Sequence, residues 1–365
     1  MGAAPAAQHP LLRHGRGGRR GGIHRSTLSQ SAMRAALATW ARAAVWRAVR
    51  LAHHADFAWL LPALARLPLP LAYGLSALRG RLNAATGRDW RSVALGLRHI
   101  RRQSLAAYAL LPGPPTATDT KRWTAQRFAT EARDELEAQL VAANRLGELQ
   151  CAVAAADLSM LAQRRGRGLV LLTPHFDSFY LGIAFLARAT GGRFNSMASA
   201  VTRDPRVDPA VSRHFEHKYR GLERCINGGS VPDMEDGLRP FYRMLQAHET
   251  LVVLADAPVL PGGAAMEVDF LGRRRRLAGG ALRLAQRSGS DLGAFVCRAL
   301  AAGRYQIEMC RIGSASDPET LERAYRFLGD AILAQPGRWW AADLLPALTE
   351  APGPGEAALD AHGKA

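Results

Sequence analysis

The feature that most constrains this fold is an apolar run that ends in a polar turn. Residues 168–173 read Gly-Leu-Val-Leu-Leu-Thr and lead into Pro174, His175 and Asp177. A short apolar run bounded by turn residues is typical of a strand buried on both faces. In an open α/β sheet, residues that follow such a strand face the region where ligands bind. The pattern predicts His175 and Asp177 in a catalytic site, and the alternative is a histidine that only caps or packs.

Strands and helices alternate along the chain after this run. The periodicity predicts strands over residues 168–173, 250–255, 292–298 and 305–309, and helices over 236–247, 279–288 and 318–334. Upstream, helical spacing predicts helices over 89–110 and 125–144, separated by a Pro-rich turn at 111–115. This order predicts a layered α/β sheet flanked by helices, preceded by a helical region.

Positive charge is concentrated at the start of the chain. The sequence has 48 Lys and Arg against 31 Asp and Glu, a net charge of +17, and nine arginines precede the first acid, Asp56. Such a segment suits anionic lipid or nucleic acid. Residues 13–25 contain no aromatic ring except histidine, which argues against nucleic acid. Residues 1–30 are predicted to be a disordered basic tail, and residues 349–365 a second disordered tail.

The next residues favour a membrane surface. Residues 33–51 interleave apolar side chains with arginines, as in an amphipathic helix that lies in an anionic interface. Residues 57–78 are nearly all apolar but are broken by Arg66 and three prolines, which favours a kinked, monotopic or re-entrant anchor over a spanning helix. The alternative is that both segments pack on the core. Residues 31–112 are thus predicted as a membrane-proximal helical region, and the arginines on its flanks favour the cytoplasmic face of a membrane.

Several chemistries lack their sequence signals. The chain has no Gly-x-Ser-x-Gly elbow, P-loop, dinucleotide fingerprint or His-Glu-x-x-His motif. Its four cysteines, Cys151, Cys225, Cys297 and Cys310, show neither metal-ligand spacing nor a disulfide framework. Reduced thiols are expected, and no metal or redox cofactor is implied.

An ordered set of short motifs carries a family resemblance over about residues 145–345. It comprises residues 165–168, His175-Phe176, Arg220-Gly221, residues 251–256, 268–272, 280–285, 294–298, 305–308 and the Pro-Gly-Arg-Trp-Trp segment within 335–340. The set resembles the lysophospholipid acyltransferase superfamily, specifically its lipid A biosynthesis (lauroyl or myristoyl) branch. The resemblance implies an acyltransferase domain, which we place at residues 113–348.

The resemblance also implies a reaction. A fatty acyl group would pass from an acyl carrier protein or coenzyme A thioester, a co-substrate and not a cofactor, to a hydroxyl or amine of a lipid or glycolipid such as a lipid A precursor. His175 would act as general base, oriented by an acid. The family has Asp or Glu five positions after the histidine, whereas this chain has Tyr180. Either Asp177 or another acid such as Asp256 replaces it, or the histidine works unassisted, or catalysis is lost and a non-catalytic lipid-binding or assembly protein remains.

Asp256 is the second candidate acid because it ends a predicted strand where the family carries an acid. It would reach the region of His175 if the two strands are neighbours, and its alternative role is to cap a turn.

Basic and polar residues complete the predicted site. Arg220 is the candidate phosphate ligand, with Arg203, Arg206 and Arg213 as competitors and a solvated basic face as the alternative. Tyr180 and Ser178 are candidate substrate contacts, although Ser178 also suits a helix N-cap. Backbone amides at the start of that helix are candidate oxyanion donors. Four arginines at 273–276 are expected in a loop that contacts anionic lipid or an acidic carrier protein.

Overall fold

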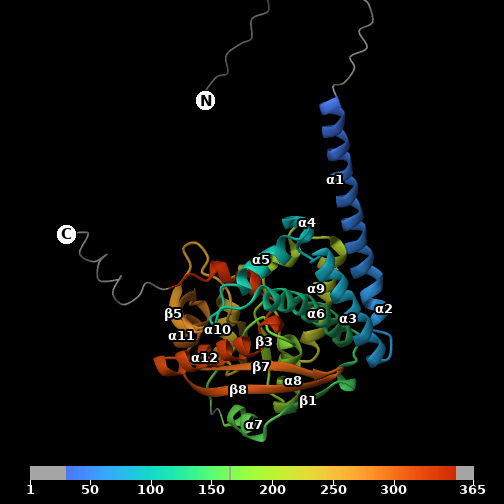
Figure 1. The fold of residues 1–365 in the computed structure, drawn as a ribbon. Coiled ribbons are helices and arrows are strands. Elements are labelled where there is room, and N and C mark those ends of the chain that lie inside the picture. Colours follow the sequence, from blue (N-terminus) through green and yellow to red (C-terminus); the bar gives the residue numbers. More distant parts are fainter. Residues whose placement is uncertain (1–29, 164–165, 351–365) are drawn as a thin grey trace, which may run out of the picture. The chain divides into compact units, whose positions relative to one another are not determined.

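The computed structural model describes residues 30–163 and 166–350, so both predicted terminal tails lie almost wholly outside the described residues. The chain divides into two compact units, residues 1–46 and 47–365. Helix α1 (Gln30–Ala55) supplies the described residues of the first unit and the first residues of the second. The helix expected over residues 33–51 is therefore present (Figure 1).

A mixed six-stranded sheet forms the centre of the second unit. Its order is β1-β8-β7-β2-β4-β3, with β7 and β8 antiparallel and the other neighbours parallel. The strands are β1 (Gln150–Val153), β2 (Leu169–Thr173), β3 (Phe194–Ser196), β4 (Thr250–Leu254), β7 (Asp291–Ala301) and β8 (Arg304–Ser314). All four predicted strands are present, and β7 and β8 run further than predicted because they pair along their whole length.

Helices cover both faces of this sheet (Figure 1). In β2, Leu169 and Leu171 join one core cluster, whereas Val170 and Leu172 join the other. The first cluster includes residues of α6 (Ala117–Ala142), α8 (Phe179–Thr190) and α9 (Pro209–Glu223). The second includes residues of α5 (His99–Tyr108), α10 (Arg239–Gln246), α11 (Gly280–Ser288) and α12 (Pro318–Ala334). Each buried side chain stabilises the fold by about 1.5–3 kcal/mol, which explains the uninterrupted apolar run.

A glycine sets the distance between α8 and the sheet. A Cβ added at Gly182 would lie 2.6 Å from the ring of Phe295 and 2.8 Å from Cβ of Cys297. Only glycine therefore allows α8 to approach β7 this closely. Since α8 begins four residues after His175, this contact also fixes the turn that carries the histidine.

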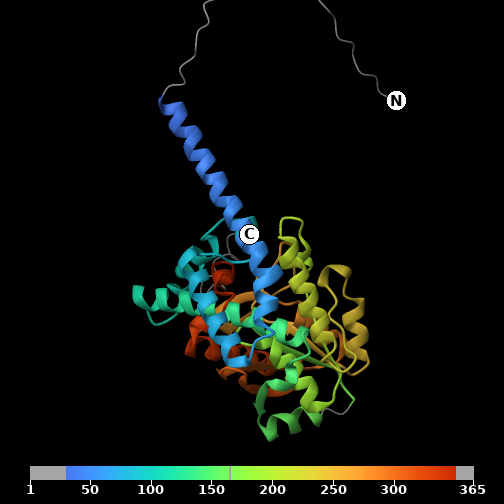
Figure 2. The same ribbon diagram turned by 90° about the vertical axis from the view of Figure 1, so that its right-hand side faces the viewer.

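The apolar segment near the start of the second unit is helical, and Pro62 and Pro70 lie in the first turns of two of its helices. It comprises the π-helical turn η1 (Asp56–Leu60), α2 (Leu61–Leu64) and α3 (Leu69–Thr86), with a break before Pro68. Leu61 and Tyr73 are buried, and Ser76 Oγ donates to the carbonyl of Ala132 in α6. Helices α3 and α6 lie side by side in both views (Figure 1 and Figure 2). Within the described residues, no helix combines the length and the apolar character needed to cross a membrane.

Two expectations about local structure are wrong. The helix predicted over residues 89–110 is divided into α4 (Ser92–Leu95) and α5, because Gly96 adopts a φ of 98° that ends the first helix. The arginines at 273–276 form strand β6 (Arg273–Ala278), which pairs with β5 (Ala265–Phe270), and not a loop. Arg275 points inward, where it donates to the carbonyl of Leu348, whereas the other three arginines are exposed.

The remaining described elements are short. They are α7 (Ala155–Ala162) and the 3₁₀ turns η2 (Leu146–Glu148), η3 (Ala200–Arg203), η4 (Met234–Asp236), η5 (Pro336–Arg338) and η6 (Ala342–Ala347). Of these, η5 and η6 flank the Trp339-Trp340 pair that borders the site described next.

Candidate active site

The carboxyl ends of two adjacent parallel strands bring His175 and Asp256 together. Thr173 at the end of β2 pairs with Leu254 at the end of β4, and the amide of Ala255 donates to the carbonyl of Thr173 at 2.8 Å. His175 and Asp256 each follow their strand by two residues. The strands that precede the two residues are therefore neighbours, as Asp256 requires in order to reach His175.

Asp256 holds the histidine through two hydrogen bonds. Its Oδ1 lies 2.9 Å from Nδ1 of His175, and its Oδ2 accepts the His175 amide at 2.9 Å. The indole N–H of Trp339 donates to the same Oδ2 at 2.7 Å. Asp256 is fully buried, whereas the His175 side chain is 21% exposed. Within the described residues Nε2 of His175 has no hydrogen-bond partner, so this nitrogen is free to meet a substrate.

The charge on Asp256 is stabilised despite its burial. Burial raises the pKa of this carboxyl group, but the positive charge of His175 and the hydrogen bonds from His175 and Trp339 outweigh it, and the net pKa is lowered. An ionised carboxylate at Nδ1 favours the tautomer that carries its proton there. Nε2 is then the nitrogen that accepts a proton.

A segment from near the end of the chain forms one wall of the site. The amide of Asp177 donates to the carbonyl of Arg338 at 2.9 Å, and the amide of Trp340 donates to the carbonyl of His175 at 3.1 Å. The ring of Trp340 packs edge-on against His175 with ring centroids 4.7 Å apart, and the ring of Phe179 also packs edge-on against His175 with centroids 5.7 Å apart. Sequence reasoning placed residues 335–340 in the resemblance but did not assign the two tryptophans to the site.

Asp177 has a different set of partners. One carboxylate oxygen pairs with Arg133, and the other pairs with Arg338 and accepts the amide of Ala299 at 3.1 Å. Asp177 has a φ of 52°, in the left-handed region that asparagine and aspartate tolerate best among non-glycine residues. The backbone there turns the carboxylate toward α6 and β7. Geometry thus favours Asp256 over Asp177 as the acid that orients the histidine.

Tyr180 and Ser178 are both buried. The Tyr180 hydroxyl donates to the carbonyl of Lys218 in α9 at 2.8 Å, and burial raises its pKa well above the ordinary value. Ser178 occupies the N-cap position of α8, but its side chain makes no capping bond and donates instead to Glu137 at 3.2 Å. The capping role expected for Ser178 is therefore wrong, and the structure gives neither side chain a surface for substrate.

Arg220 lies on the solvent side of α9. Its side chain is 67% exposed and, among the residues that the structure describes, pairs only with Glu216, 3.7 Å away and one turn earlier. Among the competing arginines, Arg203 pairs with Asp233 and Arg206 with Asp204. This geometry matches the solvated basic face, and the phosphate-binding role of Arg220 stays a prediction.

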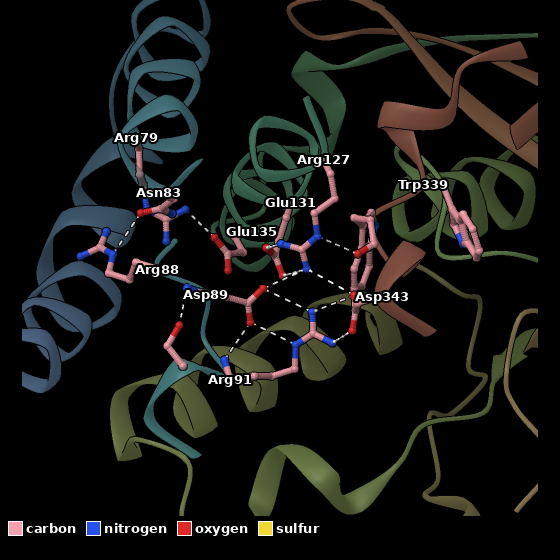
Figure 3. A network of polar contacts seen from close by, with 12 residues as sticks. Arg79, Asn83, Arg88, Asp89, Arg91, Arg127, Glu131, Glu135, Trp339 and Asp343 are labelled. Carbon is pink, nitrogen blue, oxygen red and sulfur yellow. Dashed lines mark hydrogen bonds and ion pairs between the residues drawn. The ribbon is translucent and has the colours of Figure 1, made fainter. Parts of the chain in front are cut away.

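A buried network of ion pairs helps to hold the backbone of Trp339 and Trp340, which form this wall (Figure 3). Arg127 of α6 pairs with Asp89 at 2.9 Å and Glu131 at 2.7 Å, and its Nε donates to the carbonyl of Trp340 at 2.9 Å. The hydroxyl of Tyr108 donates to the carbonyl of Trp339 at 2.9 Å. Both tryptophans are therefore held by their backbone as well as by packing. Such prior organisation lowers the cost of orienting a catalytic group.

The cysteines take no part in these contacts. All four are free thiols, with Cys297 and Cys310 buried in the sheet. The described ranges contain no group of three or more His, Cys, Asp or Glu side chains arranged to hold a metal ion.

The sheet and its His175–Asp256 pair define an α/β protein with a candidate acid–base site. The sequence profile of the bacterial lipid A biosynthesis acyltransferases matches residues 107–340, and the chain belongs to this family. The match includes His175, Asp256 and both tryptophans. No curated protein matches the sequence.

Proposed function

We propose that this protein is a membrane-associated acyltransferase that moves a fatty acyl group from an acyl carrier protein or coenzyme A thioester to a lipid or glycolipid. The family supports acyl transfer in general. One observation carries the proposed role of His175: a buried carboxylate engages its Nδ1 and leaves Nε2 free. A lipid A precursor is the proposed acceptor, through a hydroxyl or amine.

In the proposed reaction, His175 is the general base. The acceptor hydroxyl gives its proton to Nε2 as its oxygen attacks the thioester carbonyl carbon. The tetrahedral intermediate collapses, the carbon–sulfur bond breaks, and the imidazolium returns the proton to the leaving thiolate. Asp256 stabilises the imidazolium meanwhile. The amides of Asp177 and Ser178 already donate to backbone carbonyls, so oxyanion donors at the start of α8 would come from Phe179 onward.

A membrane surface is the proposed place of the reaction, on the cytoplasmic side of an inner membrane. Helix α3 presents a row of exposed leucines at helical spacing, Leu71, Leu75, Leu78 and Leu82. Clustered apolar side chains on a surface mark interaction sites. Together with the arginines of α1, they match the peripheral or monotopic binding expected for residues 31–112.

Transfer of a labelled acyl group into total membrane lipid tests the proposal. We expect transfer by the intact protein from at least one of acyl carrier protein and coenzyme A thioesters, and its loss in His175→Ala. His217→Ala, which changes an exposed histidine of α9, is the matched control and should retain transfer. Asp177→Asn should lower stability more than turnover, because it leaves Arg133 and Arg338 without their carboxylate.

A non-catalytic lipid-binding role is the second candidate. It is favoured by Tyr180, which stands at the sequence position where the family has an acid and whose hydroxyl is buried. The same assay separates the two candidates. Absence of transfer from both donors, with lipid binding retained, would support the non-catalytic role.

A further inference from the structure

A concave site adjoins the turn that carries His175, because Arg133 and Arg338 line it and pair with Asp177 in that turn. It is a pocket of about 310 Å³ between α3, α6, the end of β7 and η5. Its polar lining consists of Tyr73, Gln126, Thr130, Arg133 and Arg338. The pocket has no role in the proton transfers described above.

Arg133 and Arg338 bring surplus positive charge to this pocket. Both side chains are 22% exposed, and both pair with the one fully buried carboxylate of Asp177. A second carboxylate, Glu137, lies 3.3 Å from Nε of Arg133, and burial raises its pKa to about 7. The two guanidinium groups thus share the carboxylate of Asp177 and that of Glu137, whose raised pKa leaves it partly neutral near pH 7.

The two guanidinium groups also keep unused donors. Arg338 uses only its Nη1, which donates to Asp177 and to the carbonyl of Ala299. Arg133 uses its Nη2 on Asp177, and its Nε is buried without a hydrogen-bond partner. Nη2 of Arg338 and Nη1 of Arg133 make no hydrogen bond within the described part of the chain. Planar groups with free paired donors suit the oxygens of a phosphate.

We propose that this pocket binds the phosphate group of one of the two reactants through Arg133 and Arg338. The volume accommodates a phosphate and the atoms attached to it. The attribution to a reactant rests on the proposed acyltransferase function, whereas phosphate binding itself does not. Asp177 and Arg338 are joined through their backbones and lie two residues from His175 and Trp340 respectively. A bound phosphate would therefore be anchored to the same rigid turn as the histidine.

Calorimetric titration of the full chain tests this site with two phosphomonoesters. The first probe is 4′-phosphopantetheine, which represents the donor, and the second is short-chain dihexanoyl phosphatidic acid, which represents a lipid acceptor. We expect Arg338→Gln to weaken binding about tenfold or more, because a charged hydrogen bond is lost. Ala301→Glu places a negative charge at the exposed end of β7 that lines the pocket, leaves both arginines intact and should also weaken binding. Arg193→Gln, at an exposed pair with Glu249, is the matched control.

The outcomes separate the sources of the phosphate. Binding of phosphopantetheine alone assigns the pocket to the donor, and binding of phosphatidic acid alone assigns it to the acceptor. The proposal is overturned if neither probe binds the intact protein, or if Arg338→Gln and Ala301→Glu bind as tightly as the control. Because binding is measured without acyl transfer, failure of the pocket and failure of the proposed enzyme give different results.

Discussion

Three hydrogen bonds fix the orientation of the Asp256 carboxylate, so the effect of replacing this residue can be predicted. In Asp256→Asn, the indole N–H of Trp339 and the backbone N–H of His175 still need an acceptor, so the side-chain oxygen of the asparagine takes the Oδ2 position. Its NH₂ group then faces Nδ1 of His175 and donates to it. His175 then carries its proton on Nε2 and is unable to act as base. We expect kcat to fall by about a hundredfold or more with little change in KM, measured in the acyl-transfer assay. Activity equal to that of the unmodified protein would show that Asp256 does not orient the base.

Glu137 should make stability depend on pH. It accepts the hydroxyl of Tyr305 at 2.8 Å, and burial raises its pKa from 4.5 to about 7. The folded protein therefore binds more protons than the unfolded chain between these values. This contribution is fully present below about pH 4.5, declines as the pH rises and is lost above about pH 7, with a total of about 3 kcal/mol.

The measurement is urea denaturation of the intact protein and Glu137→Gln at a series of pH values. The difference in unfolding free energy between them should change steadily from pH 5 to pH 7 and level off above. Other buried carboxyl groups, such as Glu131, also have raised pKa values, but they are common to both proteins and cancel in the difference. A difference that stays constant with pH would contradict the prediction.

At the scale of elements, α3 has one face packed on the core and an exposed row of leucines on the other. Tyr73 and Gly80 pack toward the core, and Gly80 approaches the backbone of Ala129 too closely to tolerate a side chain. Leu75 stands in the exposed row on the opposite face. Leu75→Glu should leave the fold intact and weaken co-sedimentation with phosphatidylglycerol-rich vesicles several-fold, since it places a charge at the apolar interface.

Leu238→Glu is the matched control for that experiment. Leu238 is comparably exposed but lies before α10, outside the row on α3. It adds the same charge to the molecule and should leave vesicle binding nearly unchanged. Equal losses in the two variants would show that net charge, and not the face of α3, determines membrane binding.

The elements show which features a sequence reveals and which it does not. Helix α12 was predicted with its observed bounds, because Asp317 caps it and Pro318 begins it. The two strands that carry His175 and Asp256 were likewise visible as apolar runs. The partners of the site were not, since Trp340 reaches His175 from more than 160 residues away, Trp339 reaches Asp256 from 83 residues away, and Arg127 acts through a backbone carbonyl. Local periodicity carries no information about such contacts.

At the scale of the whole molecule, buried ion pairs connect segments that are distant in sequence. Arg91 pairs with Asp343 at 2.9 Å across 252 residues, and Arg127 pairs with Asp89 beside them (Figure 3). Burial raises the pKa of Asp89, but the charges of Arg91 and Arg127 outweigh it and lower the net value. Removal of one partner from such a network leaves an uncompensated buried charge, which is costly.

Arg127→Gln tests whether this network supports both stability and the site. We expect it to lower the free energy of unfolding by about 3 kcal/mol, because Asp89 loses an ion pair. Transfer should also fall in the protein that remains folded, since the carbonyl of Trp340 loses its donor and the ring against His175 is less well fixed. Arg122→Gln removes an exposed arginine of the same helix that pairs with Asp119, and it should change neither quantity. Urea denaturation and the transfer assay measure the two effects. If the variant is destabilised but its turnover per folded molecule is unchanged, the network supports stability alone. The two tryptophans would then hold His175 without Arg127.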